Sequence, residues 1–209
     1  MLYRISRLFA RIFFLIYFRL TVIGREHIPS EGACLVIANH ASFLDPLLLC
    51  TIFKRPIHYI TYAFFYFHPL IHWFCRHVYC IPIKKEGYDV SAFKQALRLL
   101  KQGECVGIFP EGIRSETGTI GKGQPGSALL ALKSSAQVLP IGIHGAYEAL
   151  PKGSWFPKAR RITVMIGEPF GLASQCPSDK KSAEIQDAAT NIMMEKIAEL
   201  CGRQDLLPS

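Results

Sequence analysis

The chain has 209 residues, of which 50% are apolar and 19% charged, and its formal net charge is +8. This length suits one domain with a sizeable core. The positive charge indicates an anionic partner, either nucleic acid, anionic lipid or a phosphorylated substrate. We expect no nucleic acid, because the basic residues are scattered among apolar segments and no recognition-helix, zinc-finger or RNP-like signature occurs.

The seven cysteines predict a reducing compartment. Their number is odd, and several of them sit inside apolar runs, where thiols are usually buried. Their spacing resembles no disulfide framework.

Residues 1–23 predict an amphipathic helix at a membrane interface. Arg4, Arg7 and Arg11 are three and four positions apart, so they share one helix face. Apolar side chains cover the rest of the surface: Ile5, Leu8, Phe9, Ile12, Phe13 and Ile16. The uninterrupted apolar run, 12–18, is far shorter than the ~20 residues of a spanning helix, and no signal-peptide cleavage site follows it. We therefore expect the basic stripe to face anionic headgroups.

A helix that packs on the core with its basic stripe exposed is the alternative for this segment, and both arrangements can hold at once. In either case residues 24–209 are expected to form one domain.

The rest of the chain predicts an α/β architecture, with a mostly parallel central sheet flanked by helices. Apolar runs predict strands at 34–38, 58–61, 78–83, 105–109, 138–143 and 162–166. Helices are expected at 45–53, 90–101, 127–133 and about 179–200. Asp45 is the expected N-cap of the first of these helices, with Pro46 at its first turn, and Gly202 is the expected end of the last.

His40 and Asp45 are the first candidates for chemistry, because they follow the predicted buried strand 34–38. A neutral imidazole near pH 7 is a competent base, and a carboxylate on its second nitrogen fixes the tautomer and stabilises the imidazolium. The alternative is an Asp45 that only caps its helix. Ser42 raises a hydrolase interpretation, which we disfavour because a serine two residues from its base rarely has the geometry and no nucleophile elbow occurs.

A second polar cluster, Pro110-Glu111-Gly112-Ile113-Arg114, follows the predicted strand 105–109. Loops at this position in α/β sheets bind ligands. Glu111 can accept hydrogen bonds from hydroxyls, and Arg114 can form a two-pronged contact with phosphate. The alternative is a simple turn with an exposed ion pair.

The two motifs together, Asn-His-x-Ser-x-x-Asp-Pro and then Phe-Pro-Glu-Gly-x-Arg-Ser, resemble the glycerophospholipid acyltransferase family. The resemblance is closest to the bacterial 1-acylglycerol-3-phosphate acyltransferases and covers roughly residues 20–170. It implies that His40 is the base and Asp45 its partner. It also implies an acceptor-binding motif that comprises Glu111, Gly112, Arg114 and Ser115. The apolar run 138–143, with its central proline, is similar to a further block of the family.

The resemblance further implies the reaction and its setting. An acyl group passes from acyl-CoA or acyl carrier protein to a lysophospholipid, with no metal, no other cofactor and no covalent enzyme intermediate. Together with the N-terminal helix, it implies a peripheral or monotopic protein on the cytoplasmic face of the cell membrane, with membrane lipids as partners.

Two departures from the family pattern leave the acceptor open. The family usually has Ile-Pro-Val-x-Arg where this chain has Ile-Pro-Ile-Lys-Lys, so phosphate contact through Lys85 keeps the charge but loses the two-pronged geometry. Many members carry Lys and Glu where this chain has Tyr62 and Phe64. Another lysolipid or an acylated amino acid therefore stays an alternative acceptor, and a non-catalytic lipid-binding protein is the alternative from another class.

Three further patterns are expected to carry structure rather than chemistry. Gly121-x-Gly123-x-x-Gly126 matches a dinucleotide fingerprint but does not directly follow a strand, and it contains Pro125. A run of metal-friendly side chains matches no zinc spacing: His68, His72, Cys75, His77 and Cys80. The aromatic run 64–67 is expected in the core, with a lipid or acyl-groove contact as its alternative.

Overall fold

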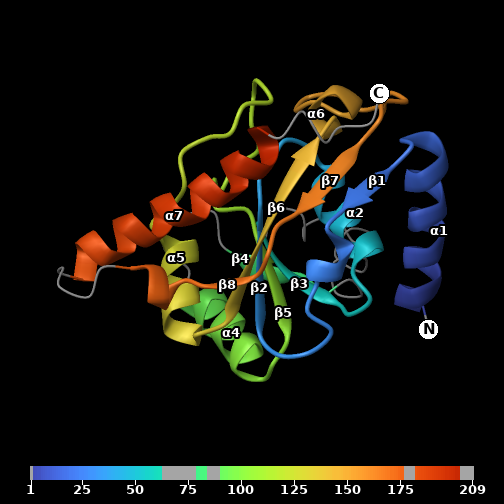
Figure 1. The fold of residues 1–209 in the computed structure, drawn as a ribbon. Helices are drawn as coiled ribbons and strands as arrows, with labels where there is room; N and C mark the ends of the chain where they lie inside the picture. Colours follow the sequence, from blue (N-terminus) through green and yellow to red (C-terminus); the bar gives the residue numbers. More distant parts are fainter. Residues whose placement is uncertain (1, 63–78, 84–89, 177–181, 203–209) are drawn as a thin grey trace.

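The structure is a computed structural model that describes residues 2–62, 79–83, 90–176 and 182–202 (Figure 1). Its α/β architecture, with a mostly parallel sheet between two layers of helices, confirms the predicted fold class. Lys85, Phe64, the aromatic run 64–67 and four of the five metal-friendly residues lie outside the described residues; only Cys80 of that set is included.

The sheet has eight strands within the described residues, and seven of them follow the order β1-β7-β6-β2-β5-β3-β4. The strands are β1 (Thr21–Ile23), β2 (Cys34–Ala38), β3 (Ile57–Tyr62), β4 (Ile81–Ile83), β5 (Cys105–Ile108), β6 (Gln137–His144), β7 (Thr163–Ile166) and β8 (Phe170–Gly171). All pairs are parallel except β6 with β7 and β6 with the short β8.

Helices cover both faces of the sheet (Figure 1). One face carries α1 (Leu2–Tyr17) and α2 (Leu44–Ile52); the other carries α4 (Val90–Lys101), α5 (Pro125–Ser134) and α7 (Ser182–Gly202). The short α6 (Ala146–Ala149) and the 3₁₀ turns η1 (Arg25–His27) and η3 (Ala173–Gln175) lie in connections. Alternate residues of β2 enter different cores, Val36 on the α1–α2 side and Leu35 and Ile37 on the other. Burial of both faces explains why this strand reads as a continuous apolar run.

Two predicted helix ends are wrong. Helix α2 begins at Leu44 with Phe43 as its N-cap residue, so Asp45 is its second residue and not its cap. The Asp45 carboxylate instead accepts the backbone N–H groups of Ala41 and Ser42, which precede the helix. At the other end of the chain, Gly202 is the last residue of α7 and does not lie beyond it.

Helix α1 packs on the domain through a narrow line of residues. Phe14 and Phe18 are buried, whereas the wider apolar face is exposed: Leu8, Phe9, Ile12, Phe13, Leu15, Ile16 and Tyr17. Arg7 donates hydrogen bonds to the carbonyl oxygens of Phe53 (2.8 Å) and Lys54 (2.7 Å), at the end of α2. A cation suits this place because the last carbonyls of a helix lack partners within the helix. Of the predicted headgroup-facing stripe of Arg4, Arg7 and Arg11, Arg7 is therefore turned to the end of α2 instead. Arg11 is exposed, and the side chain of Arg4 lies outside the described part of the structure.

Among the described helices, none combines the length and the apolar character that crossing a bilayer requires.

Candidate active site

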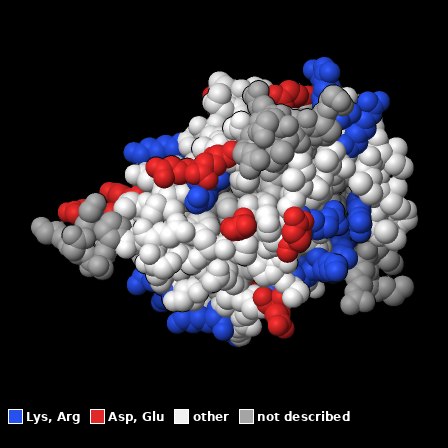
Figure 2. All heavy atoms as spheres, viewed as in Figure 1, with Lys and Arg blue, Asp and Glu red and all other residues white. Residues whose placement is uncertain are grey.

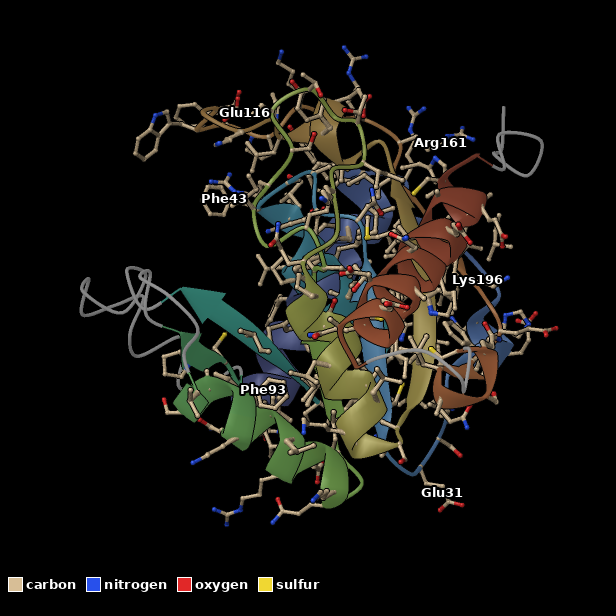
Figure 3. All side chains as sticks on the ribbon, turned by 90° about the vertical axis from the view of Figure 1, so that its left-hand side faces the viewer. Glu31, Phe43, Phe93, Glu116, Arg161 and Lys196 are labelled. Atoms are coloured by element: carbon tan, nitrogen blue, oxygen red, sulfur yellow. The ribbon has the colours of Figure 1, made fainter. Side chains whose placement is uncertain are left out.

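The two predicted motifs meet because β2 and β5 are parallel neighbours, in a register that pairs Ile37 with Ile108. Their following loops therefore leave the same edge of the sheet, where parallel α/β sheets place ligand sites. In Figure 3, Phe43 from the first loop and Glu116 from the second lie in the upper half of the molecule, whereas Glu31, which precedes β2, lies at the opposite end. The pairing of distant segments at this edge is what builds the site.

His40 and Asp45 form the predicted pair. His40 Nδ1 lies 2.8 Å from Asp45 Oδ2, and the same oxygen accepts the N–H groups of Ala41 (2.8 Å) and Ser42 (2.7 Å). An ionised carboxylate can only accept, so Nδ1 carries the proton and Nε2 is left as the basic nitrogen. Asp45 is fully buried and the His40 side chain is 18% exposed, so the imidazole is the member of the pair that a substrate can reach.

The second loop holds His40 through both of its peptide groups. The His40 N–H donates to Glu111 Oε1 (2.8 Å), and the His40 carbonyl accepts the N–H of Ser115 (2.8 Å). The imidazole also stacks on the Phe109 ring, with centroids 4.0 Å apart and planes 14° apart. Phe109 stacks in turn on Tyr59, at 6.0 Å. Backbone and ring of His40 are therefore fixed by the same loop.

A glycine in β5 makes room for this stack of rings. A Cβ atom at Gly107 would lie 2.4 Å from the Tyr59 ring, closer than side chains tolerate. The sequence motif begins with Phe109 but assigned no role to its ring, and Gly107 and Tyr59 were not predicted to support the site. Nothing local marks a ring as the support of a residue that is distant in the chain.

The Glu111 carboxylate bonds backbone groups through both of its oxygens. It is 5% exposed, and its second oxygen, Oε2, accepts the N–H of Gly121 (2.7 Å). Burial raises the pKa of Glu111, and the N–H donors of His40 and Gly121 oppose that rise. Because both oxygens bind backbone groups, Glu111 holds His40 and the 110–124 loop together; its contact with a substrate hydroxyl stays a prediction.

Gly112 and Ser115 also shape this loop. Gly112 has a φ of 74° and donates its N–H to the Phe109 carbonyl (3.0 Å), a tight turn that favours glycine. Ser115 Oγ accepts the N–H of Gly118 (2.9 Å). These two bonds shape the loop on either side of Arg114, and the Ser115 N–H in addition ties the loop to the His40 carbonyl.

Arg114 lies against the first loop. Its guanidinium carbon is 3.4 Å from the centroid of the Phe43 ring, a cation–π contact. Burial lowers the pKa of Arg114, and the nearby Asp45 charge opposes this. Arg114 Nη1 and Asp45 Oδ1 are both buried, and neither has a hydrogen-bond partner among the described residues. Buried donors normally have partners, so Nη1 is a donor suited to an anionic ligand oxygen.

Two polar residues beside His40, Ser42 and Asn39, bond to backbone groups of the domain. Ser42 is fully buried, and its hydroxyl donates to the Leu150 carbonyl (2.8 Å) while it accepts the N–H of Leu44 (3.2 Å). This geometry argues against the hydrolase interpretation. Asn39 bonds both backbone groups of Ile143, through Nδ2 (3.0 Å) and Oδ1 (2.8 Å), and so extends the pairing of β2 with β6 up to the site.

Two patterns remain, the glycine motif 121–126 and the possible metal site. Gly121 bonds Glu111, and a Cβ atom at Gly123 would lie 2.6 Å from Met194 of α7. These glycines therefore serve the packing of the loop. Among the described residues, no group of three or more His, Cys, Asp or Glu side chains is arranged to hold a metal ion.

Comparison with known proteins agrees with the predicted family and fold. A family model described as acyltransferase matches residues 19–144. The chain is 30% identical to the 1-acyl-sn-glycerol-3-phosphate acyltransferase of Pseudomonas aeruginosa, over 87% of this chain and 70% of that protein. It is 28% identical to the protein of the same name from Bacillus subtilis, over 89% and 90% of the two chains. The crystal structure of the 1-acyl-sn-glycerophosphate acyltransferase PlsC from Thermotoga maritima superposes with a TM-score of 0.74, at 26% identity, over 96% of this chain and 81% of that one.

Plant relatives are longer. The chain is 31% identical to the chloroplastic 1-acyl-sn-glycerol-3-phosphate acyltransferase LPAT1 of Arabidopsis thaliana, over 72% of this chain but only 43% of that protein. It likewise covers 44% of the relative from Brassica napus. The chain thus spans less than half the length of these plant proteins.

Glu111→Gln tests the bridging role of this carboxylate. An amide replaces one acceptor oxygen with a donor that must face a backbone N–H, so we expect a loss of about 1–3 kcal/mol in the free energy of unfolding. Urea denaturation followed by circular dichroism measures it. Glu116→Gln is the matched control, because Glu116 is exposed and pairs only with exposed Lys152 in the described structure. Equal unfolding midpoints for the two variants would contradict the bridging role.

Proposed function

This chain belongs to the acyltransferase family, and we propose that it transfers an acyl group from acyl-CoA or acyl carrier protein to the free hydroxyl of a lysophospholipid. The proposed acceptor is 1-acylglycerol-3-phosphate, which gives phosphatidic acid. The observation that carries the proposal is the His40–Asp45 pair, whose histidine backbone is bonded to the loop that carries Arg114. The names of the bacterial relatives support the choice of acceptor.

The reaction follows from the tautomer of His40. Nε2 takes the proton of the acceptor hydroxyl as that oxygen attacks the thioester carbonyl, and the buried Asp45 carboxylate stabilises the imidazolium that forms. The C–S bond then breaks, the new ester forms, and His40 returns its proton to the departing thiolate. The attacking oxygen comes from the substrate, which agrees with the internal bonding of Ser42.

Arg114 is the proposed phosphate ligand. Its Nη1 has no hydrogen-bond partner among the described residues, and the loop that carries it is bonded to the His40 backbone. A phosphate bound to Nη1 would therefore hold the glycerol hydroxyl in a fixed position relative to the base. We propose Lys85 as a second phosphate contact. Glu111, Gly112 and Ser115 support this binding by holding the loop.

We also propose that the protein lies on the cytoplasmic face of the membrane through its first 23 residues. The exposed apolar face of α1 supports this location, because exposed apolar surface of this extent on one helix side is typical of interfacial helices. The residues from 24 onward form the acyltransferase domain in this proposal.

His40→Ala tests the base. We expect the rate of thiol release from acyl-CoA with lysophosphatidic acid to fall roughly 10²–10⁴-fold, the usual contribution of general base catalysis. A thiol-reactive dye measures the rate, and circular dichroism checks the fold. His27→Ala, in η1, is the control and should retain activity. Substantial turnover by folded His40→Ala would refute the mechanism, and no turnover by the unaltered protein would favour the lipid-binding alternative.

Arg114→Ala tests the phosphate contact. Loss of a charged hydrogen bond predicts a rise of roughly 10–100-fold in the KM for lysophosphatidic acid, with the KM for the thioester little changed. Phe43→Leu should give a smaller rise of the same kind, and Phe43→Trp should preserve the wild-type KM because it keeps the cation–π contact. Steady-state assays with a panel of phosphorylated and unphosphorylated lysolipids measure these constants. A rise that is equal for both classes of acceptor would argue against phosphate recognition.

The double substitution Ile12→Ser with Ile16→Ser tests the N-terminal helix. Both side chains are exposed, so folding should be unaffected while binding to vesicles weakens, by roughly tenfold or more given ~1.5–3 kcal/mol for each buried large side chain. Cosedimentation with phosphatidylglycerol-containing vesicles measures the binding. Val90→Ser, an exposed apolar position on α4, should leave it unchanged. Undiminished binding by the double variant would overturn the assignment.

A further inference from the structure

The segment 151–161, between α6 and β7, carries the two most exposed large apolar side chains among the described residues. Trp155 is 90% exposed and Phe156 is 84% exposed. Neither takes part in the chemistry proposed above. Two adjacent aromatic rings held in water are unfavourable unless something covers them, so they indicate a contact surface.

This segment is held in place by the domain. The Lys158 N–H donates to the Ala149 carbonyl (2.7 Å), and the Ser154 N–H donates to the Pro151 carbonyl (3.1 Å). The hydroxyl of Tyr17, the last residue of α1, donates to the Pro157 carbonyl (2.9 Å). The rings therefore project from a fixed backbone, and that backbone is tied to the helix whose apolar face is exposed.

The positive charge of segment 151–161 indicates an anionic partner. The segment contains Lys152, Lys158, Arg160 and Arg161 and no acidic residue. In the described part of the chain, no ion pair involves Lys158, Arg160 or Arg161. Figure 2 shows basic side chains gathered at the upper right of the molecule, beside α6 and the start of β7 as labelled in Figure 1. Exposed Trp and Phe beside unpaired cations suit the interface of a bilayer with anionic lipids.

The segment also touches the loop that carries Arg114. Lys152 Nζ is 2.6 Å from Glu116 Oε1, and the Tyr147 hydroxyl, from α6, donates to the Glu116 carbonyl (2.7 Å). In Figure 3, Arg161, Glu116 and Phe43 all lie in the upper half of the molecule. A surface bound through this segment therefore lies close to the site.

We propose that segment 151–161 is a second membrane contact, with Trp155 and Phe156 inserted among the headgroups of an anionic bilayer. Together with α1 it fixes the orientation of the domain, so that the site receives its lysolipid directly from the bilayer. This inference rests on the proposed function for the identity of the lipid substrate. A protein partner would use the same rings, but the unpaired cations of the segment and its link to α1 favour a lipid surface.

The double substitution Trp155→Ser with Phe156→Ser tests the contact on the full-length protein. We expect its partition onto vesicles of phosphatidylcholine and phosphatidylglycerol to fall roughly tenfold or more. Transfer to an acceptor embedded in those vesicles should fall in parallel, whereas transfer to a monomeric short-chain lysophosphatidic acid should stay unchanged. Val90→Ser again serves as the control. Vesicle binding equal to wild type, or an equal loss of transfer to the short-chain acceptor, would overturn the proposal.

A conservative variant gives an independent measurement. Trp155→Phe should keep vesicle binding, and the difference between its fluorescence and that of wild type isolates the signal of Trp155. Brominated phosphatidylcholine in the same vesicles should quench that difference signal; unquenched Trp155 in bound protein would also overturn the contact. If the wild type transfers no acyl group but both vesicle results hold, the proposed function fails and the membrane contact stands.

Discussion

One oxygen atom, Asp45 Oδ2, links the fold to the proposed chemistry. It accepts two backbone N–H groups from the turn after β2 and also the imidazole of His40. The oxygen that stabilises the turn is therefore also the oxygen that orients the imidazole. Since the carboxylate is fully buried and each donor lies within 2.8 Å, the turn holds Oδ2 in a fixed place from which it orients the ring. Such shared bonds give the site its geometry before any substrate binds.

The register of β2 and β5 extends this constraint to the second motif. Because the two strands end at the same edge, Glu111 and Ser115 can hold the His40 peptide from both sides. Arg114 stands between these two anchors and rests on Phe43, which belongs to the His40 turn. Base and guanidinium are thus parts of one packed unit. An acceptor held by its phosphate is for that reason also oriented towards the base.

Periodicity and local motifs predicted much of this structure. The strand 34–38 and the helix 90–101 have the expected bounds, and the five-residue spacing predicted the contact of His40 with Asp45. Residue type alone did not reveal which donors a carboxylate would accept, so the predicted cap at Asp45 was wrong and the backbone partners of Glu111 were missed. Likewise, spacing placed Arg7 on a helix face, but only packing against the end of α2 determines which way that face points.

The burial of Arg114 is what suits it to the proposed anionic ligand, although the cation already lies near Asp45. Its Nη1 and the Asp45 Oδ1 are both buried without hydrogen-bond partners among the described residues, which leaves desolvation on each side uncompensated. The Phe43 ring contacts the guanidinium and the Asp45 charge stabilises it, but no acceptor among the described residues forms a hydrogen bond with Nη1. A phosphate oxygen can act as that acceptor, and the bond gains strength from the low local dielectric. In the proposed function, the same partial burial that destabilises the unliganded cation therefore strengthens its contact with the phosphate of the acceptor.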